Sequence, residues 1–225
     1  MAGGKEIKGQ ISSIKNTQKI TSEKELVAAS KMRKTQEKMQ LYRPFTEKIR
    51  EVISHIAYSH SEDNHPYLGA RKECRRVGYI VVSTDRGLCG GLNINLFRYL
   101  LKDMQEWEQK NVEMDLFLIG KKAENFFKRI GANIVGKTDH IDDKPSMSEL
   151  VNLVRVMLDN FNAKDLDAIY LVGNDFVNTM VQKPFIRQLL PLKKEALDLK
   201  TIDKYWDYIY EPDSSTQLMS QLMVR

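Results

Sequence analysis

The first part of the chain is rich in helix-forming residues, with apolar side chains at regular intervals. From Lys5 to about Ser59 there is one proline, Pro44, and no glycine after Gly9. Lys, Glu, Gln, Ala and Met dominate this segment and favour helix, so a single helix is predicted. At ~1.5 Å per residue it would extend roughly 80 Å. A helix of that length cannot lie within a domain of this size and is expected to project, with a kink or a break at Pro44.

The apolar positions of this helix recur at alternating intervals of four and three residues. Ten of fifteen such positions are apolar, and polar or small side chains interrupt the pattern from Gln18 to Thr35. The fifteen positions are Ile7, Ile11, Ile14, Gln18, Thr21, Glu25, Ala28, Met32, Thr35, Met39, Tyr42, Thr46, Ile49, Ile53 and Ile56. A sustained 3.5-residue period is the seam of a coiled coil. Without a partner on that seam, residues 5–58 should be poorly ordered or self-associating, because packing supplies most helix stability.

The rest of the chain alternates short apolar runs with amphipathic stretches. Strands are predicted at residues 77–84, 112–120, 132–135, 167–173, 176–190 and 205–211. Helices are predicted at residues 93–109, 121–130 and 147–161, the last capped by Ser146, with a further helix starting at 214–215. Such alternation is typical of an α/β domain with a largely parallel sheet. The predicted fold is a long, coiled-coil-type N-terminal helix projecting from a Rossmann-like α/β domain. Its parts are residues 1–60, 74–211 and 212–225, with 59–73 as a linker.

Composition excludes several classes of protein. The 225 residues are 42% apolar and 29% charged, which is typical of soluble proteins, and no stretch offers the roughly 18 apolar residues of a spanning helix. The start MAGGKEIKGQ lacks the apolar core of a secretory signal, so any membrane connection is expected to be peripheral. The two cysteines, Cys74 and Cys89, cannot form a disulfide scaffold, which favours a reducing compartment.

The excess positive charge is confined to the first helix. Residues 1–60 carry a net charge of +6, whereas the other 165 residues carry −1. Three interpretations follow: a nucleic-acid binder, a solvated coiled-coil face, or a shaft inside an acidic protein sleeve. Aromatic residues are almost absent from the helix and Glu dilutes its bases, which argues against nucleic acid.

A glycine-rich segment, STDRGLCGGLN at residues 83–93, connects a predicted strand to a helix, where many α/β proteins bind phosphate. It matches neither GxGxxG nor GxxxxGK[ST], so a tight turn or an interface is preferred over a nucleotide site. Cys89 follows Asp85 and Arg86 but has no histidine nearby in the sequence, so no nucleophile is predicted. The four histidines form no close ligand pair, and neither a metal nor a cofactor is predicted.

Five segments carry a resemblance to one family. They are KEIKGQISSIKNTQKIT (Lys5–Thr21), VAASKMRK (Val27–Lys34), RPF (Arg43–Phe45), STDRGLCGGLNINLF (Ser83–Phe97) and YEPD (Tyr210–Asp213). With them the chain resembles the gamma subunit of F-type ATP synthase, the central rotor stalk, over essentially its whole length. The resemblance implies an antiparallel coiled-coil axle built from N- and C-terminal helices around a central α/β domain. It also implies a non-catalytic role: the axle rotates inside a ring of alpha and beta subunits and couples proton flow to ATP synthesis or hydrolysis.

The resemblance also implies three contact regions. The axle would face the acidic lever of the beta subunits, the glycine loop would lie near the lower rim of the catalytic ring, and the 205–211 region would lie toward the epsilon subunit and the c-subunit ring. The implied interface residues are Lys24, Lys31, Met32, Arg33, Asp85, Arg86, Gly87, Tyr208, Tyr210 and Glu211. Without a transit peptide, the expected location is the cytoplasmic face of a bacterial inner membrane, with membrane contact only through the complex.

Two departures from the family pattern modify these expectations. Lys24 stands where the family has an apolar methionine, which is expected to alter the coupling between rotation and catalysis. The family continues for about one more long helix beyond Arg225, and that helix would supply the mate of the first. Two alternative functions follow: a truncated regulatory or non-functional fragment that binds the ATPase head, and an independent nucleotide-binding α/β enzyme.

Overall fold

A computed structural model describes residues 2–59, 67–68, 71, 73–138 and 147–192 of the chain. The chain divides into two compact units, Met1–Val52 and Ile53–Arg225. The first is helical and the second holds a five-stranded sheet with helices on both faces. The boundaries of the three predicted parts stay predictions. Several predicted features lie outside the described residues: the strand at 205–211, the helix from 214, the cap at Ser146 and most of the linker at 59–73.

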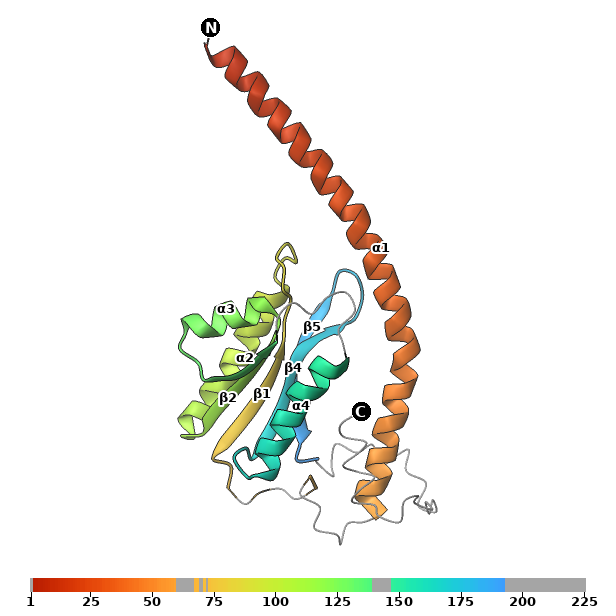
Figure 1. The fold of residues 1–225 in the computed structure, drawn as a ribbon, viewed down its shortest axis with the longest axis vertical. Coiled ribbons are helices and arrows are strands. Elements are labelled where there is room, and N and C mark those ends of the chain that lie inside the picture. The colour runs from red at the N-terminus through yellow and green to blue at the C-terminus, as the bar shows by residue number, and fades with distance from the viewer. Residues whose placement is uncertain (1, 60–66, 69–70, 72, 139–146, 193–225) are drawn as a thin grey trace. The chain divides into compact units, whose positions relative to one another are not determined.

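The predicted N-terminal helix is confirmed. Helix α1 spans Ala2–Ser59, a single run of 58 residues. The alternative of a break at Pro44 is wrong, because the helix continues through this residue, and Figure 1 shows it curving along its length. A proline removes one backbone donor from the helix. In the adjoining turns Arg43 Nε donates to Glu47 at 3.1 Å and the Thr46 hydroxyl donates to the Tyr42 carbonyl at 3.1 Å, both within the helix.

The second unit contains a mixed sheet of five strands. The strands are β1 (Arg76–Val82), β2 (Glu113–Ile119), β3 (Ile134–Thr138), β4 (Ala168–Phe176) and β5 (Gln182–Leu190). The helices are α2 (Leu92–Gln109), α3 (Lys121–Arg129) and α4 (Met147–Asn162). The strand order is β3-β2-β1-β4-β5, and only β5 runs antiparallel to its neighbour. The prediction of a largely parallel sheet is therefore confirmed.

One predicted strand is wrong in detail. Residues 176–190 were expected to form one strand, but Phe176 is the last residue of β4 and pairs with Gln182, the first residue of β5. A tight turn separates the two, so this stretch closes an antiparallel hairpin. The turn forms because the Asn178 side chain accepts hydrogen bonds from backbone N–H groups that follow it, as Asn commonly does in turns.

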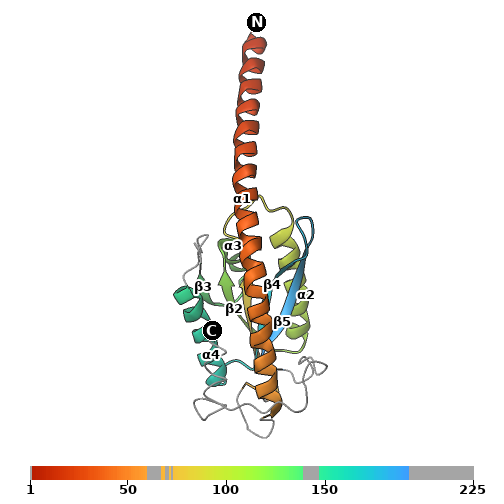
Figure 2. The ribbon, with the colours of Figure 1, turned by 90° about the vertical axis from the view of Figure 1, so that its right-hand side faces the viewer.

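Apolar packing fixes both faces of the sheet. Val77, Tyr79 and Val81 of β1 belong to a buried cluster with residues of α2 and α3. The alternate residue Gly78 faces the other side, where an added Cβ would meet Met157 of α4 at 3.4 Å. This alternation is the two-residue period of a strand. The largest fully buried side chains include Tyr79, Phe117, Phe127 and Phe161. Figure 1 and Figure 2 show the arrangement of the sheet domain, with α2 and α3 on one face of the sheet and α4 on the other.

A partly buried ion pair fastens the segment that enters β1. Arg71 donates to Asp167 Oδ1 at 2.8 Å and to the Phe161 carbonyl at 2.6 Å, with its guanidinium 4.6 Å from the Phe161 ring centre. The backbone N–H groups of Arg75 and Arg76 donate to Asp167 Oδ2 at 2.7 and 3.0 Å. Burial alone would raise the pKa of Asp167, but these donors outweigh it and the pKa is lowered.

Candidate interaction surfaces

The loop that follows β1 is fastened to the start of α3. The first three backbone N–H groups of α3 donate to the Asp85 carboxylate at 2.9 Å, the Thr84 carbonyl at 3.0 Å and the Ser83 hydroxyl at 2.9 Å. A helix N-terminus attracts anions through such N–H groups. Here the chain itself fills the site, and Asp85 supplies the negative charge. The start of α3 is therefore not arranged to bind a phosphate.

Gly120 makes this attachment possible. It adopts a positive φ of 97°, which side-chain-bearing residues rarely tolerate. An added Cβ would collide with the Ser83 carbonyl oxygen and lie 2.8 Å from the Ser83 hydroxyl. Sequence reasoning did not single out this residue, although a glycine between an apolar run and a Lys-rich helix start was the available signal. A glycine is needed here for the loop to lie against α3.

Asn93 organises the inner side of the same loop. Its buried side chain donates to the Thr84 hydroxyl at 2.7 Å and to Cys89 Sγ at 3.4 Å, and it accepts from the Thr84 N–H at 3.3 Å. The Thr84 hydroxyl donates to the Arg86 carbonyl at 2.7 Å. The half-buried Cys89 is thus part of the loop framework. Sequence reasoning missed Asn93, whose only signal was its position just after the glycines.

The tip of the loop points away from the domain. Leu88 is fully exposed and has a positive φ of 62°, an uncommon conformation for a residue with a side chain. Arg86 and Gly87 are also exposed. The three predicted interface residues of the loop therefore differ in their roles. Asp85 is hydrogen-bonded within the chain, whereas Arg86 and Gly87 are exposed to a partner, together with Leu88.

The predicted contact segment of α1 carries accessible charge. Lys24, Lys31, Met32 and Arg33 are all exposed. Arg33 Nε lies 3.4 Å from a carboxylate oxygen of Glu37, with both side chains more than half exposed. Such surface pairs contribute little to stability, because water screens them. Arg33 could exchange this pair for a carboxylate on another protein at small cost.

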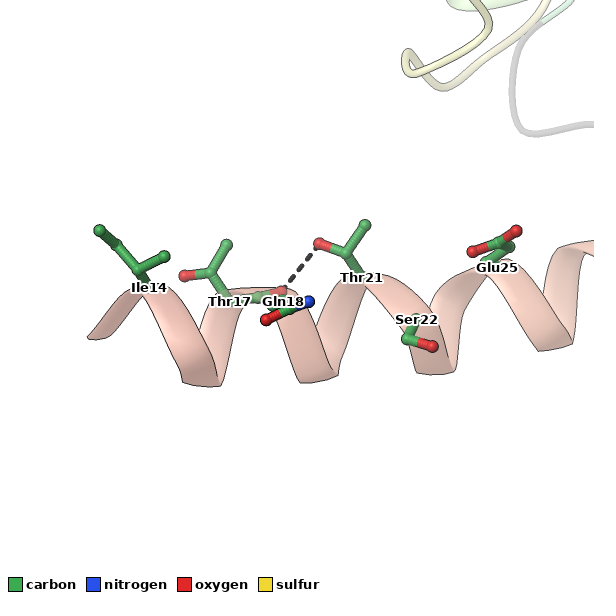
Figure 3. Close-up of a pocket in the computed structure, with 6 residues that line it drawn as sticks. All are labelled: Ile14, Thr17, Gln18, Thr21, Ser22 and Glu25. Atoms are coloured by element: carbon green, nitrogen blue, oxygen red, sulfur yellow. Dashed lines mark hydrogen bonds between the residues drawn. The ribbon is translucent and has the colours of Figure 1, made fainter. Parts of the chain in front are cut away.

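The predicted seam of α1 offers a surface for a second helix. Its apolar members Ile7, Ile11 and Ile14 are exposed. Figure 3 shows a shallow groove along the helix where the seam becomes polar. It is lined by Ile14, Thr17, Gln18, Thr21, Ser22 and Glu25, four of which are seam positions. Gaps between side chains on one helix are where the side chains of a packed partner insert.

The threonine hydroxyls of the seam are bonded within the helix. The Thr21 hydroxyl donates to the Thr17 carbonyl at 2.8 Å, drawn as a dashed line in Figure 3. Thr35 and Thr46 donate in the same way to the carbonyls four residues before them, at 3.0 and 3.1 Å. A hydroxyl group that already donates to a carbonyl of its own helix needs no further acceptor when a second helix packs over it.

Neither a membrane-spanning helix nor a metal cluster occurs among the described residues. None of the described helices combines the length and apolar character that crossing a membrane requires. No group of three or more His, Cys, Asp or Glu among these residues could hold a metal ion. The remaining predicted interface residues, Tyr208, Tyr210 and Glu211, lie outside the described residues.

Comparison with known proteins assigns the family. A family model described as ATP synthase matches residues 3–225. The ATP synthase gamma chain of Coxiella burnetii (strain RSA 493 / Nine Mile phase I) is 55% identical over the whole chain, which covers 77% of that relative. The gamma chain of Legionella pneumophila (strain Corby) is 50% identical with the same coverage.

A solved structure supports the same fold. A chain of the Tetrahymena thermophila mitochondrial ATP synthase central stalk and c-ring structure matches with a TM-score of 0.57 at 16% identity. The match covers 88% of this chain and 85% of that one. At this identity the likeness concerns the fold alone: a long helix combined with an α/β sheet. Together with the sequence matches over the full chain, it identifies the chain as a member of the ATP synthase gamma-chain family.

Proposed function

We propose that the chain works as the central rotor shaft of an F-type proton-translocating ATP synthase and has no catalytic site of its own. Family membership makes it a gamma-type subunit of ATP synthase. The observation that carries the mechanical role is α1, an uninterrupted helix of 58 residues with an exposed seam. A helix of this length acts as a stiff rod, so it can transmit rotation over a distance larger than the sheet domain.

The proposal that the chain lacks catalytic chemistry is supported by the glycine loop. The loop matches neither of the glycine-rich patterns that bind nucleotide phosphates, GxGxxG and GxxxxGK[ST]. Its residues Asp85, Thr84 and Ser83 are engaged within the domain, because they accept hydrogen bonds from the N–H groups that start α3. The loop is built to lie against its own domain and to present Arg86, Gly87 and Leu88 outward, which suits a protein interface.

The proposed partners follow from the charge and the family. The net charge of +6 on residues 1–60 suits an acidic sleeve, which we propose is the ring of alpha and beta subunits. Lys24, Lys31, Met32 and Arg33 would face the acidic lever of the beta subunits. Asp85, Arg86 and Gly87 would lie near the lower rim of that ring, with Asp85 holding the loop in shape. Tyr208, Tyr210 and Glu211 would meet the epsilon subunit and the c-subunit ring.

The proposed location is peripheral, on the cytoplasmic face of a bacterial inner membrane. In this proposal the chain reaches the membrane only through the c-subunit ring. It needs neither a cofactor nor nucleic acid, because its work is mechanical. Subunit contacts, and not a lipid-binding segment of the chain, would hold it at the membrane surface.

Reconstitution tests the proposal. The chain should co-purify with alpha and beta subunits, support ATP hydrolysis and restore ATP-driven proton pumping to membranes that lack a gamma chain. Association and hydrolysis without pumping would instead identify a regulatory or non-functional fragment. ATP binding by the purified chain alone, measured by calorimetry, would favour an independent nucleotide-binding enzyme and contradict the proposal.

A further inference from the structure

Exposed apolar side chains outside α1 gather at one end of the sheet. Among the described residues beyond α1, seven of the eleven large apolar side chains that are exposed belong to segments at the carboxyl ends of β1 and β4. They are Val82, Leu88, Ile94, Phe176, Val177, Met180 and Val181. Figure 1 and Figure 2 both show the loop after β1 and the β4–β5 hairpin extending from the same end of the domain. Clustered apolar exposure of this kind is typical of an interaction site.

Polar bonds hold the tip of the hairpin in one shape. Asn178 Oδ1 accepts from the backbone N–H groups of Met180 and Val181 at 2.9 and 2.8 Å. The Gln182 amide donates to the carbonyls of Asn178 and Thr179 at 3.2 and 3.3 Å. These hydrogen bonds are made within the turn, whereas the Met180 side chain is 88% exposed. A preformed tip binds a partner at a smaller entropic cost than a mobile one.

The charges around this end have one dominant sign. The carboxylates are used within the chain: Asp85 accepts a bond from the start of α3 and Asp175 pairs with Arg187. Among the described residues, no ion pair with an acidic side chain is found for the four cations near the loop and the hairpin. They are Arg86, Lys121, Lys122 and Lys183. The cations would complement a partner that carries carboxylates.

We propose that the hairpin tip, residues 176–181, and the Leu88 loop form one docking surface for a protein that offers an apolar socket bordered by carboxylates. Met180 and Leu88 enter the socket, and Arg86 and Lys183 meet its acidic border. The inference rests on the proposed function, in which this partner is the head of alpha and beta subunits. In this proposal the hairpin is a second contact with the head, beside the glycine loop. The head then binds the end of the sheet through two segments.

Binding of the full chain to purified alpha and beta subunits, measured by biolayer interferometry, tests the inference. Met180→Ser should weaken binding about tenfold, equivalent to about 1.4 kcal/mol, because a buried apolar contact is lost. Ile130→Ser is the matched control, since Ile130 is 51% exposed but lies at the other end of α3. It should leave binding unchanged within about twofold. Lys183→Glu should weaken binding and reduce its dependence on salt.

Each alternative outcome contradicts a different statement. Equal binding by Met180→Ser and Ile130→Ser, with thermal melts like those of the parent chain, would overturn the docking surface and leave the rotor function intact. Failure of the parent chain itself to bind would refute the proposed function and the identity of this partner together. If Met180→Ser instead abolished self-association in sedimentation, with head binding unchanged, the surface would belong to a second copy and the inference would be wrong.

Discussion

Removal of the Asp167 carboxylate, which binds the segment that enters β1, makes a quantitative test. Asp167 accepts three hydrogen bonds, from Arg71 and from the backbone N–H groups of Arg75 and Arg76. The side chains of Arg71 and Asp167 are only 22% and 14% exposed. Asp167→Asn keeps the size of the side chain but removes its charge. It also replaces one acceptor oxygen by an NH2 group, which cannot accept a hydrogen bond from these donors. The variant therefore leaves a partly buried guanidinium without its counterion.

The expected loss of unfolding free energy is about 3 kcal/mol, since breaking one side of a buried charged pair is costly. For a protein of this size each kcal/mol corresponds to about 2–4 °C in melting temperature, so the variant should melt roughly 6–12 °C lower. The pKa of Asp167 is lowered from its ordinary value of 3.8. Its stabilisation is therefore complete above about pH 4 and is lost as the pH falls through the lower native value. The difference between parent and variant should shrink below pH 4.

Thermal denaturation of the full chain followed by circular dichroism at several pH values measures both effects. Asp175→Asn is the matched control, because it breaks an ion pair with Arg187 whose side chains are about half exposed. That variant should cost less than about 1 kcal/mol. A melting temperature for Asp167→Asn within about 2 °C of the control, or a difference that persists unchanged at pH 3, would refute the reasoning.

Four further predictions concern the loop and the helix. Gly120→Ala should destabilise the chain by about 3 kcal/mol in denaturant titrations, because its Cβ collides with Ser83. Asp85→Ala should cost about 1 kcal/mol by the same measurement, through loss of a helix cap. Lys24→Met should change the ratio of proton pumping to ATP hydrolysis in reconstituted membranes, and an unchanged ratio would refute altered coupling. The isolated chain should self-associate along residues 5–58 in sedimentation experiments or show reduced helicity, and a rigid monomeric helix would contradict this.

The fold was predictable where one periodicity governs a long segment. α1 follows from its helix-forming composition, and the break expected at Pro44 does not occur, because a proline removes only one backbone donor from a helix of 58 residues. The parallel strands follow from apolar runs separated by amphipathic helices. The error at residues 176–190 arose because β-favouring residues continue through the turn. The side chain of Asn178 makes that turn, and its hydrogen bonds are not visible in a hydropathy pattern.

The candidate site was predictable only in outline. The lack of a phosphate fingerprint led to the prediction of a tight turn or an interface at residues 83–93, and this stays a prediction. The inward role of Asp85 could not be predicted, because its partner lies 36 residues further along the chain. Leu88 and Met180 could not be singled out either. Their exposure depends on a positive φ in one case and on a side-chain-capped turn in the other.

Two residues of the polar interruption of the α1 seam, Thr21 and Thr35, are compatible with burial in a coiled coil. A polar side chain on a seam is costly when burial leaves a donor without a partner. Thr21 and Thr35 already donate to their own helix, so a second helix would cover their methyl groups without that cost. The seam there contributes less hydrophobic stabilisation than the isoleucines at Ile7 to Ile14. A partner helix should therefore be held most firmly by the apolar part of the seam, while the charged segment around Arg33 stays available for contacts with the surrounding protein.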